Sequence, residues 1–224
     1  MVGNQTVRLR GMSRPRLTYF DAPISRGEEC RLALYLAGVE FEDVRLERHE
    51  WLTLKPKTPF GSLPTLELDG AGVLAQSNAL LTLVGRRHGL LPKDDVEASR
   101  HEAILQHCED LRAAFAPTLR MSDAEEKKTA REKLVELYVP GWAANVENKI
   151  RGPFFAGAQP SVADVKLFVV ARWLTGGTVD HVPTTVLSDA PKLNALISAF
   201  AEHERVKAWY AEPRKSGVVK AFGT

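Results

Sequence analysis

Side chains that could do chemistry lie in the N-terminal part of the chain. Gln76 and Ser77 stand where a helical pattern begins, and the free N–H groups of a helix start favour an anion. Trp51 and Lys55 are four residues apart, so they lie on one side of a turn. Tyr19 ends a β-rich run and carries a hydroxyl. An anion is therefore favoured at the helix start, although each of these side chains alone also fits a structural role, as a strand aromatic, a helix cap, a half-buried tryptophan or a solvated lysine.

Patterns of period two and period 3.6 predict the elements that position these side chains. In order, they are a strand, a helix, a strand, a proline-interrupted loop, a hairpin and a helix. These segments cover residues 16–20, 26–38, 42–46, 55–63, 65–75 and 78–88. Ser25 and Ser77 precede the two helices, so both fit an N-cap.

Beyond a linker at 89–95, every segment has helical spacing. A long charged helix is expected over 122–150, a helix that is apolar nearly all round over 167–174, and two more from 191 and 202. Ser161 and Asp164 have the spacing of a capping box.

Composition narrows the class of protein. The chain has 224 residues, of which 44% are hydrophobic and 26% charged, and its net charge is +2, so neither nucleic-acid binding nor a polybasic membrane role is favoured. We expect no membrane span, because no apolar run approaches the roughly 20 residues that one needs. Cys30 and Cys108 have no metal-ligand spacing and suggest no disulfide, which favours the reducing cytoplasm. Residues 1–14 fit a disordered leader better than a transit peptide.

Three segments resemble the cytosolic glutathione transferases. They are Leu17-Thr-Tyr-Phe20 followed by Arg26-Gly-Glu-Glu-Cys-Arg31, Trp51-x-x-x-Lys55 leading to Pro59-Phe-Gly-Ser-Leu-Pro64, and Gln76-Ser77. The chain is most similar to the tyrosine-type sigma class, which includes the glutathione-dependent prostaglandin D synthases. The resemblance covers nearly the whole chain after the leader.

This resemblance implies the glutathione transferase fold and its division into domains. An α/β thioredoxin-like domain that binds glutathione would span 15–88, and an all-helical domain with a hydrophobic substrate site would span 96–224. The substrate site would lie between the first βα loop and the helix that carries Arg112, Phe115 and Arg120. A homodimer is implied, and no metal.

Matched residue by residue, the family implies a glutathione site. Its members would be Tyr19, Arg26, Trp51, Lys55, Gly61, Ser62, Leu63, Pro64, Gln76 and Ser77, completed by Asp110 of the partner subunit. Leu63-Pro64 would carry a cis peptide and pair with the glutathione backbone, and Gln76 and Ser77 would bind its γ-glutamyl carboxylate. Phe60 would plug into the partner subunit. Ser62 departs from the family, where a longer polar side chain often stands, so contact from its short hydroxyl is doubtful.

Tyr19 would stabilise the thiolate of glutathione, which is the nucleophile. Lowering a thiol pKa of about 8.5 by two units needs about 2.7 kcal/mol, and one charge-assisted hydrogen bond supplies about 1.5–3 kcal/mol. Ser25 is the alternative donor, because a serine in this loop has that role in other classes. The loop between Tyr19 and Arg26 is also one residue longer than the sigma pattern.

The resemblance predicts an enzyme that conjugates glutathione to small hydrophobic electrophiles. Two alternatives stay open. One is a glutathione-dependent isomerase or peroxidase, which would use the same thiolate. The other is a transferase-like protein that binds ligands without catalysis, because a fold does not fix a function.

Overall fold

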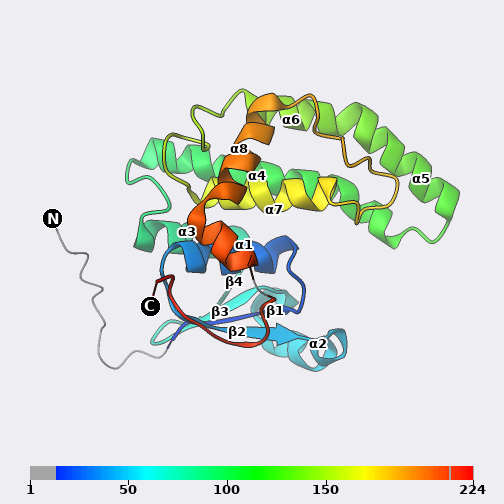
Figure 1. Cartoon of the computed structure of the whole chain (residues 1–224). Helices are drawn as coiled ribbons and strands as arrows, with labels where there is room; N and C mark the ends of the chain where they lie inside the picture. Colours follow the sequence, from blue (N-terminus) through cyan, green and yellow to red (C-terminus); the bar gives the residue numbers. More distant parts are fainter. Residues whose placement is uncertain (1–13, 212, 224) are drawn as a thin grey trace.

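In a computed structural model, which describes residues 14–211 and 213–223, the chain forms a mixed sheet beneath a layer of helices (Figure 1). The strands are β1 (Arg16–Phe20), β2 (Phe41–Leu46), β3 (Thr65–Leu68), β4 (Gly72–Ala75) and β5 (Gly217–Val219). The helices are α1 (Ser25–Leu36), α2 (Arg48–Leu54), α3 (Ser77–His88), α4 (Asp95–Phe115), α5 (Ala124–Lys133), α6 (Val139–Glu147), α7 (Val162–Thr175), α8 (Pro191–Glu202) and α9 (Glu204–Tyr210). No helix of the described segments is long and apolar enough to span a membrane.

The sheet has the strand order β4-β3-β1-β2-β5. β1 is central, parallel to β2 and antiparallel to β3. The first two predicted strands and the hairpin are confirmed. The helices expected beyond residue 96 are confirmed. One short strand was not expected there: β5 returns from near the C-terminus and pairs with β2. Figure 1 shows this last segment, in red, running below α1 towards β2.

Two other segments differ from expectation. The loop predicted over 55–63 contains two 3₁₀ turns, Lys55–Lys57 and Pro59–Gly61, and the short helix α2 precedes them. The long helix expected over 122–150 is divided by a π-helical segment, Leu134–Tyr138. Pro140 explains the interruption, because it lacks the N–H that a continuous α-helix would direct at the carbonyl four residues earlier.

Helix α7 is buried nearly all round, as the apolar segment 167–174 predicted. Its two faces belong to two cores. One face packs with the sheet, α1 and α3, through Val162, Val165, Phe168 and Val169. The other packs with α4, α6 and α8, through Ala163, Leu167, Val170, Ala171 and Leu174. The spacing of three and four residues on each face makes α7 the element that joins the two layers.

The predicted capping box is confirmed at the start of α7. Asp164 Oδ2 accepts the Ser161 N–H at 2.8 Å and its hydroxyl at 2.6 Å. Asp164 Oδ1 accepts the Phe155 N–H at 2.7 Å, so the same carboxylate also fixes the loop before the helix.

Charged side chains are buried between the two layers, which the sequence did not lead us to expect. Lys166 Nζ, fully buried in α7, donates to Glu29 of α1 at 2.8 Å, Asn78 of α3 at 2.9 Å and Glu109 of α4 at 2.5 Å. Arg112 of α4 donates to the same two carboxylates. We refer to Arg26, Glu29, Asn78, Glu109, Arg112 and Lys166 as the interlayer ion cluster.

We predict that Lys166→Met lowers the free energy of unfolding by about 3–5 kcal/mol, because Glu29 and Glu109 each lose a charged hydrogen-bond partner that methionine cannot replace. Lys128→Met is the control, since that side chain is exposed on α5. Urea unfolding followed by circular dichroism measures both. Equal midpoints for the two variants would mean that the cluster does not hold the layers together.

Candidate functional site

Strand register brings three of the predicted site residues to one edge of the sheet. Thr18 pairs with Thr65, and Thr65 pairs with Ala75. One residue further along each strand, towards this edge, come Tyr19 at the end of β1, Pro64 just before β3 and Gln76 just after β4. Adjacent strands are about 4.8 Å apart, so these three positions form one continuous row. The Leu63-Pro64 peptide is cis, as predicted.

Tyr19 lines a cavity of about 760 Å³ between the loop after β1 and the start of α2. Trp51 lines the same cavity, and its ring lies edge-on to Phe20 at a centroid distance of 6.0 Å. The ring of Tyr19 rests directly on the backbone of Gly27, where a β-carbon would come within 2.0 Å of Tyr19 Cδ1. Glycine at position 27 is therefore what lets the ring lie over the first turn of α1.

Ser25 is not an N-cap, which corrects the structural role expected for it. The residue before α1 is Ile24, and it makes no side-chain capping bond. Ser25 is the first helical residue and has a φ of 64°, a left-handed conformation that few non-glycine residues adopt. It lines the same cavity as Tyr19. Strained residues of this kind cluster at functional sites. The Ser25 hydroxyl therefore stays an alternative to Tyr19 as the donor to a thiolate.

The loop before β3 is held in an unusual conformation. Phe60 and Gly61 are both left-handed, with φ values of 58° and 55°, and Ser62 is extended. The stem of Lys55 runs alongside Gly61, since a β-carbon there would meet Lys55 Cε at 3.6 Å. Phe60 is 80% exposed, although its side chain is aromatic.

Helix α3 begins without a side-chain cap. Its N-cap residue is Gln76, with a φ of 73°, and Ser77 is the first helical residue, so the N-cap role considered for Ser77 is wrong. Helix α3 starts at the sheet edge, so the positive end of its dipole lies there, and with no capping side chain an anion could be stabilised at this point. Asn78, the next residue, is bound by Lys166 of the interlayer ion cluster.

Arg26 points to the helical layer. Its guanidinium donates twice to Glu109 Oε2, at 2.9 and 2.6 Å. Burial alone would raise the pKa of Glu109, but Lys166, Arg112 and the bond from Arg26 outweigh it and lower that pKa to about 2. With three cations and two carboxylates, the interlayer ion cluster has one surplus positive charge, and Arg26 is its most exposed member.

Asp110 does not reach the cavity of Tyr19 in its own chain. It lines a different groove, of about 790 Å³, between α4 and α6, and lies 3.8 Å from His107. Ile104 and Phe155 give this groove apolar walls.

The two cysteines are poor nucleophiles. Both Cys30 and Cys108 are free and buried, and burial raises the pKa of each thiol, to about 12 for Cys108. A thiolate acting here would have to come from a bound ligand. Residues 14–211 and 213–223 contain no group of three or more His, Cys, Asp or Glu side chains placed to hold a metal.

Two of the residues expected to line the second-substrate site are structural. Phe115 is 1% exposed and packs edge-on against Trp173. Arg112 is buried and bound by Glu29 and Glu109. Only Arg120 is exposed.

Sequence reasoning missed the charged residues that support the site. Glu28, Glu29, Arg31, Asp43 and Lys166 are all buried. One signal was available: Lys166 stands between Val165 and Leu167, directly before the apolar segment 167–174, where a charge needs a buried partner.

The sheet edge, the cis proline, the uncapped helix and the helical layer define a thioredoxin-like domain joined to a helical domain. A family model described as "Glutathione S-transferase, N-terminal domain" matches residues 15–85, and one described as "Glutathione S-transferase, C-terminal domain" matches residues 109–213. Glutathione S-transferase 1 of Ascaris suum is 34% identical over 212 residues, which cover 92% of this chain and 99% of that protein. The chain belongs to the glutathione S-transferase family, whose co-substrate is glutathione.

Two solved structures resemble the whole described fold. A prostaglandin synthase D of Nilaparvata lugens superposes with a TM-score of 0.80 at 27% identity, over 91% of this chain and all of that one. A monomeric glutathione S-transferase of the hookworm Necator americanus gives a TM-score of 0.74 at 28% identity, over 91% of this chain and 99% of that one.

We predict that Gly27→Ala destabilises the protein by about 1–3 kcal/mol, because the new methyl group forces the Tyr19 ring out of position. Gly141→Ala is the matched control. It also lies in a helix, but nothing stands within 4 Å of its added β-carbon, so it should stabilise by about 0.5–1 kcal/mol. Thermal unfolding measures both. A stabilised Gly27→Ala variant would show that the ring moves freely.

Proposed function

We propose that this enzyme conjugates the thiolate of bound glutathione to small hydrophobic electrophiles. The observation that carries the proposal is the row of Tyr19, cis Pro64 and Gln76 along one sheet edge. Two strand spacings are about 10 Å, and an extended tripeptide spans about the same length. Glutathione can therefore lie across this edge with its cysteine beside Tyr19 and its γ-glutamyl carboxylate at the start of α3.

Each remaining residue has a role in this arrangement. Leu63 and Pro64 would pair with the cysteinyl backbone in the manner of an added strand, and Ser77 would bind the γ-glutamyl carboxylate. Trp51 and Lys55 would hold the glycine end. Gly61 and Ser62 would shape the loop around it, and the charge on Arg26 would favour the thiolate.

An isomerase remains the second candidate, because one structural relative is named a prostaglandin synthase. It would use the same thiolate on a different substrate, as a peroxidase would. A ligand-binding protein without activity is disfavoured by the intact set Tyr19, Trp51, Lys55, Leu63, Gln76 and Ser77. We place the enzyme in the cytoplasm, because its two free thiols fit a reducing compartment.

Tyr19→Phe should raise the pKa of the bound glutathione thiol by about 1–2 units and slow turnover, while glutathione affinity changes little, because one hydrogen bond to the thiolate is lost. Ultraviolet titration of the bound thiolate is the measurement. Ser25→Ala is the matched variant on the other side of the cavity. A larger pKa shift for Ser25→Ala than for Tyr19→Phe would transfer the role to the serine.

We also infer a homodimer in which each copy completes the site of the other. Phe60 is exposed and lies two residues before Ser62, and the groove between α4 and α6 offers apolar walls next to Asp110. If Phe60 of one copy docked in the groove of a second copy, Asp110 of the second copy would lie beside the row of Tyr19, Pro64 and Gln76 in the first. There it could meet the γ-glutamyl ammonium of glutathione. A C₂ axis repeats the contact twice.

Phe60→Ala should weaken the dimer about thirtyfold or more, because an interface anchor contributes about 2 kcal/mol or more. Leu137→Ala, which truncates another exposed apolar side chain, should have no effect. Sedimentation velocity over a range of concentrations measures dissociation. Because a relative is monomeric, a monomeric wild type that binds glutathione normally is the result that would refute this assembly.

A further inference from the structure

The loop between Tyr19 and α1 is fastened to two arginines that share one buried carboxylate. Arg31 of α1 donates to the carbonyls of Phe20 and Ala22 at 3.1 and 2.9 Å. Arg45 of β2 donates to the carboxylate of Asp21 at 3.0 Å. Three consecutive residues, Phe20, Asp21 and Ala22, are thus bound by the two arginines, and all three line the cavity of Tyr19.

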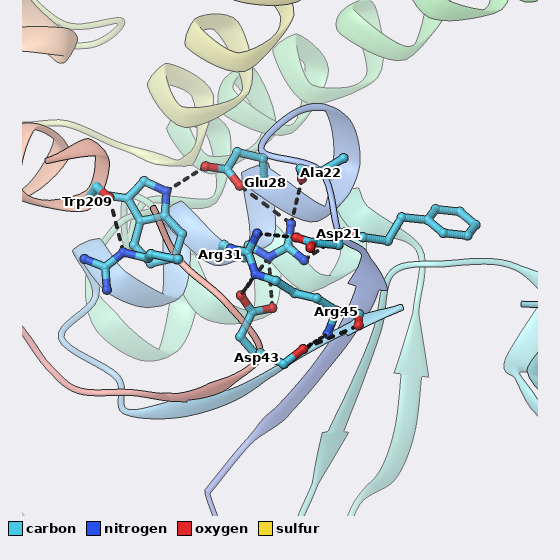
Figure 2. Close-up of polar contacts among 10 residues, drawn as sticks. Asp21, Ala22, Glu28, Arg31, Asp43, Arg45 and Trp209 are labelled. Carbon is cyan, nitrogen blue, oxygen red and sulfur yellow. Dashed lines mark hydrogen bonds and ion pairs between the residues drawn. The ribbon is translucent and has the colours of Figure 1, made fainter. Parts of the chain in front are cut away.

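Asp43 is the acceptor that both arginines share. Its two oxygens lie 2.9 and 3.1 Å from Arg31 Nε, and Oδ2 also accepts from Arg45 Nε at 2.8 Å. Asp43 and Arg31 are fully buried. Figure 2 shows the carboxylate beneath the two guanidinium groups, with Asp21 and Ala22 beyond them.

The C-terminal segment packs against the helix and the strand that carry Arg31, Asp43 and Arg45. Trp209 of α9 donates its indole N–H to Glu28 at 2.6 Å, and Glu28 lies 3.6 Å from Arg31. Ser216 binds the backbone of Arg45 on both sides, accepting its N–H at 2.9 Å and donating to its carbonyl at 3.4 Å. β5 then pairs with β2 at Asp43 itself, opposite Gly217. The strand that carries Asp43 and Arg45 is therefore covered on its outer edge.

Stability alone does not account for the buried ion pairs of Asp43 with Arg31 and Arg45. Burying ion pairs costs desolvation that apolar side chains of similar volume would avoid, so a buried network is weak evidence for stability and better evidence for a fixed geometry. The geometry fixed here is that of the loop joining Tyr19 to Ser25. A displacement of about 1 Å at a reacting group can cost two orders of magnitude in rate.

We propose that Asp43 is a positioning residue for catalysis, which acts through Arg31 and Arg45 on the loop after β1, and that Trp209 and Ser216 of the C-terminal segment belong to the same support. The inference rests on the proposed function, since it assumes that a hydroxyl of this loop faces the glutathione thiol. It adds residues to the reaction that touch neither substrate.

Asp43→Asn tests the proposal, because the amide keeps the volume but loses the charge and one acceptor. We expect turnover with glutathione and an aryl halide to fall about tenfold, the pKa of the bound thiol to rise by about half a unit or more, and glutathione affinity to change less than twofold. Asp180→Asn is the matched control. Asp180 also pairs with a buried arginine, Arg131, at 3.4 Å, but on the helical layer, so its loss should leave the thiol pKa unchanged.

Two further measurements separate positioning from mere stability. Hydrogen exchange should become faster at the amide of Asp21, which is bonded to the Leu46 carbonyl at 3.0 Å, in Asp43→Asn and in Ser216→Ala. Ser216→Ala and Trp209→Phe change only the residues around the ion pairs of Asp43, so they remain usable if Asp43→Asn does not fold. Each should raise the pKa of the bound thiol, as Asp43→Asn does. When either is combined with Asp43→Asn, the pKa shift should be smaller than the sum of the two single shifts.

A lower melting temperature with an unchanged thiol pKa in all three variants would overturn the proposal and leave the group a purely structural one. The proposed function fails differently, when neither Tyr19→Phe nor Ser25→Ala moves the thiol pKa. If one of those does and Asp43→Asn does not, the activity stands and the positioning role is refuted.

Discussion

The ammonium group of Lys166 is the contact on which the arrangement of the site depends. It binds three helices at once, and two of them begin at the sheet edge where glutathione would lie. Asn78 follows Ser77 directly, and Glu29 lies one turn after Arg26. A buried lysine needs acceptors on every side, so the starts of α1 and α3 cannot shift relative to α4 and α7 without breaking an ion pair. One side chain of the helical layer thus fixes both helix starts of the other layer.

Much of the fold was predictable because its signals are local. Strand alternation, the hairpin with its Asp-Gly turn and the capping box at Ser161 depend on residues close in sequence. The resemblance added the cis peptide at Leu63-Pro64, which residue statistics alone would argue against. Tyr19, Pro64 and Gln76 were each proposed from the sequence, but their alignment along one edge follows from strand register, which only the structure supplies.

Other features were not predictable, because they pair residues far apart. β5 is a three-residue strand that exists through its pairing with β2, and no periodicity of its own reveals it. Glu28 and Asp43 look like surface charges until Trp209 and Arg31 are placed beside them. The N-cap role considered for Ser25 and Ser77 is wrong, although residue type and position favour it. The backbone instead places both one residue inside their helices, where a hydroxyl is free to meet a ligand.

Both ends of the proposed glutathione site lie beside buried charges rather than apolar packing alone. Under this proposal, the interlayer ion cluster would support the γ-glutamyl end through Asn78, and Asp43 would support the thiol end through Arg31 and Arg45. Apolar contacts are non-directional and would allow a loop to settle in several ways. Hydrogen bonds from a planar guanidinium fix both distance and angle. In this proposal, desolvating these charges is the cost of holding a small ligand in one position relative to a hydroxyl, whereas the rest of α7 packs through two apolar cores.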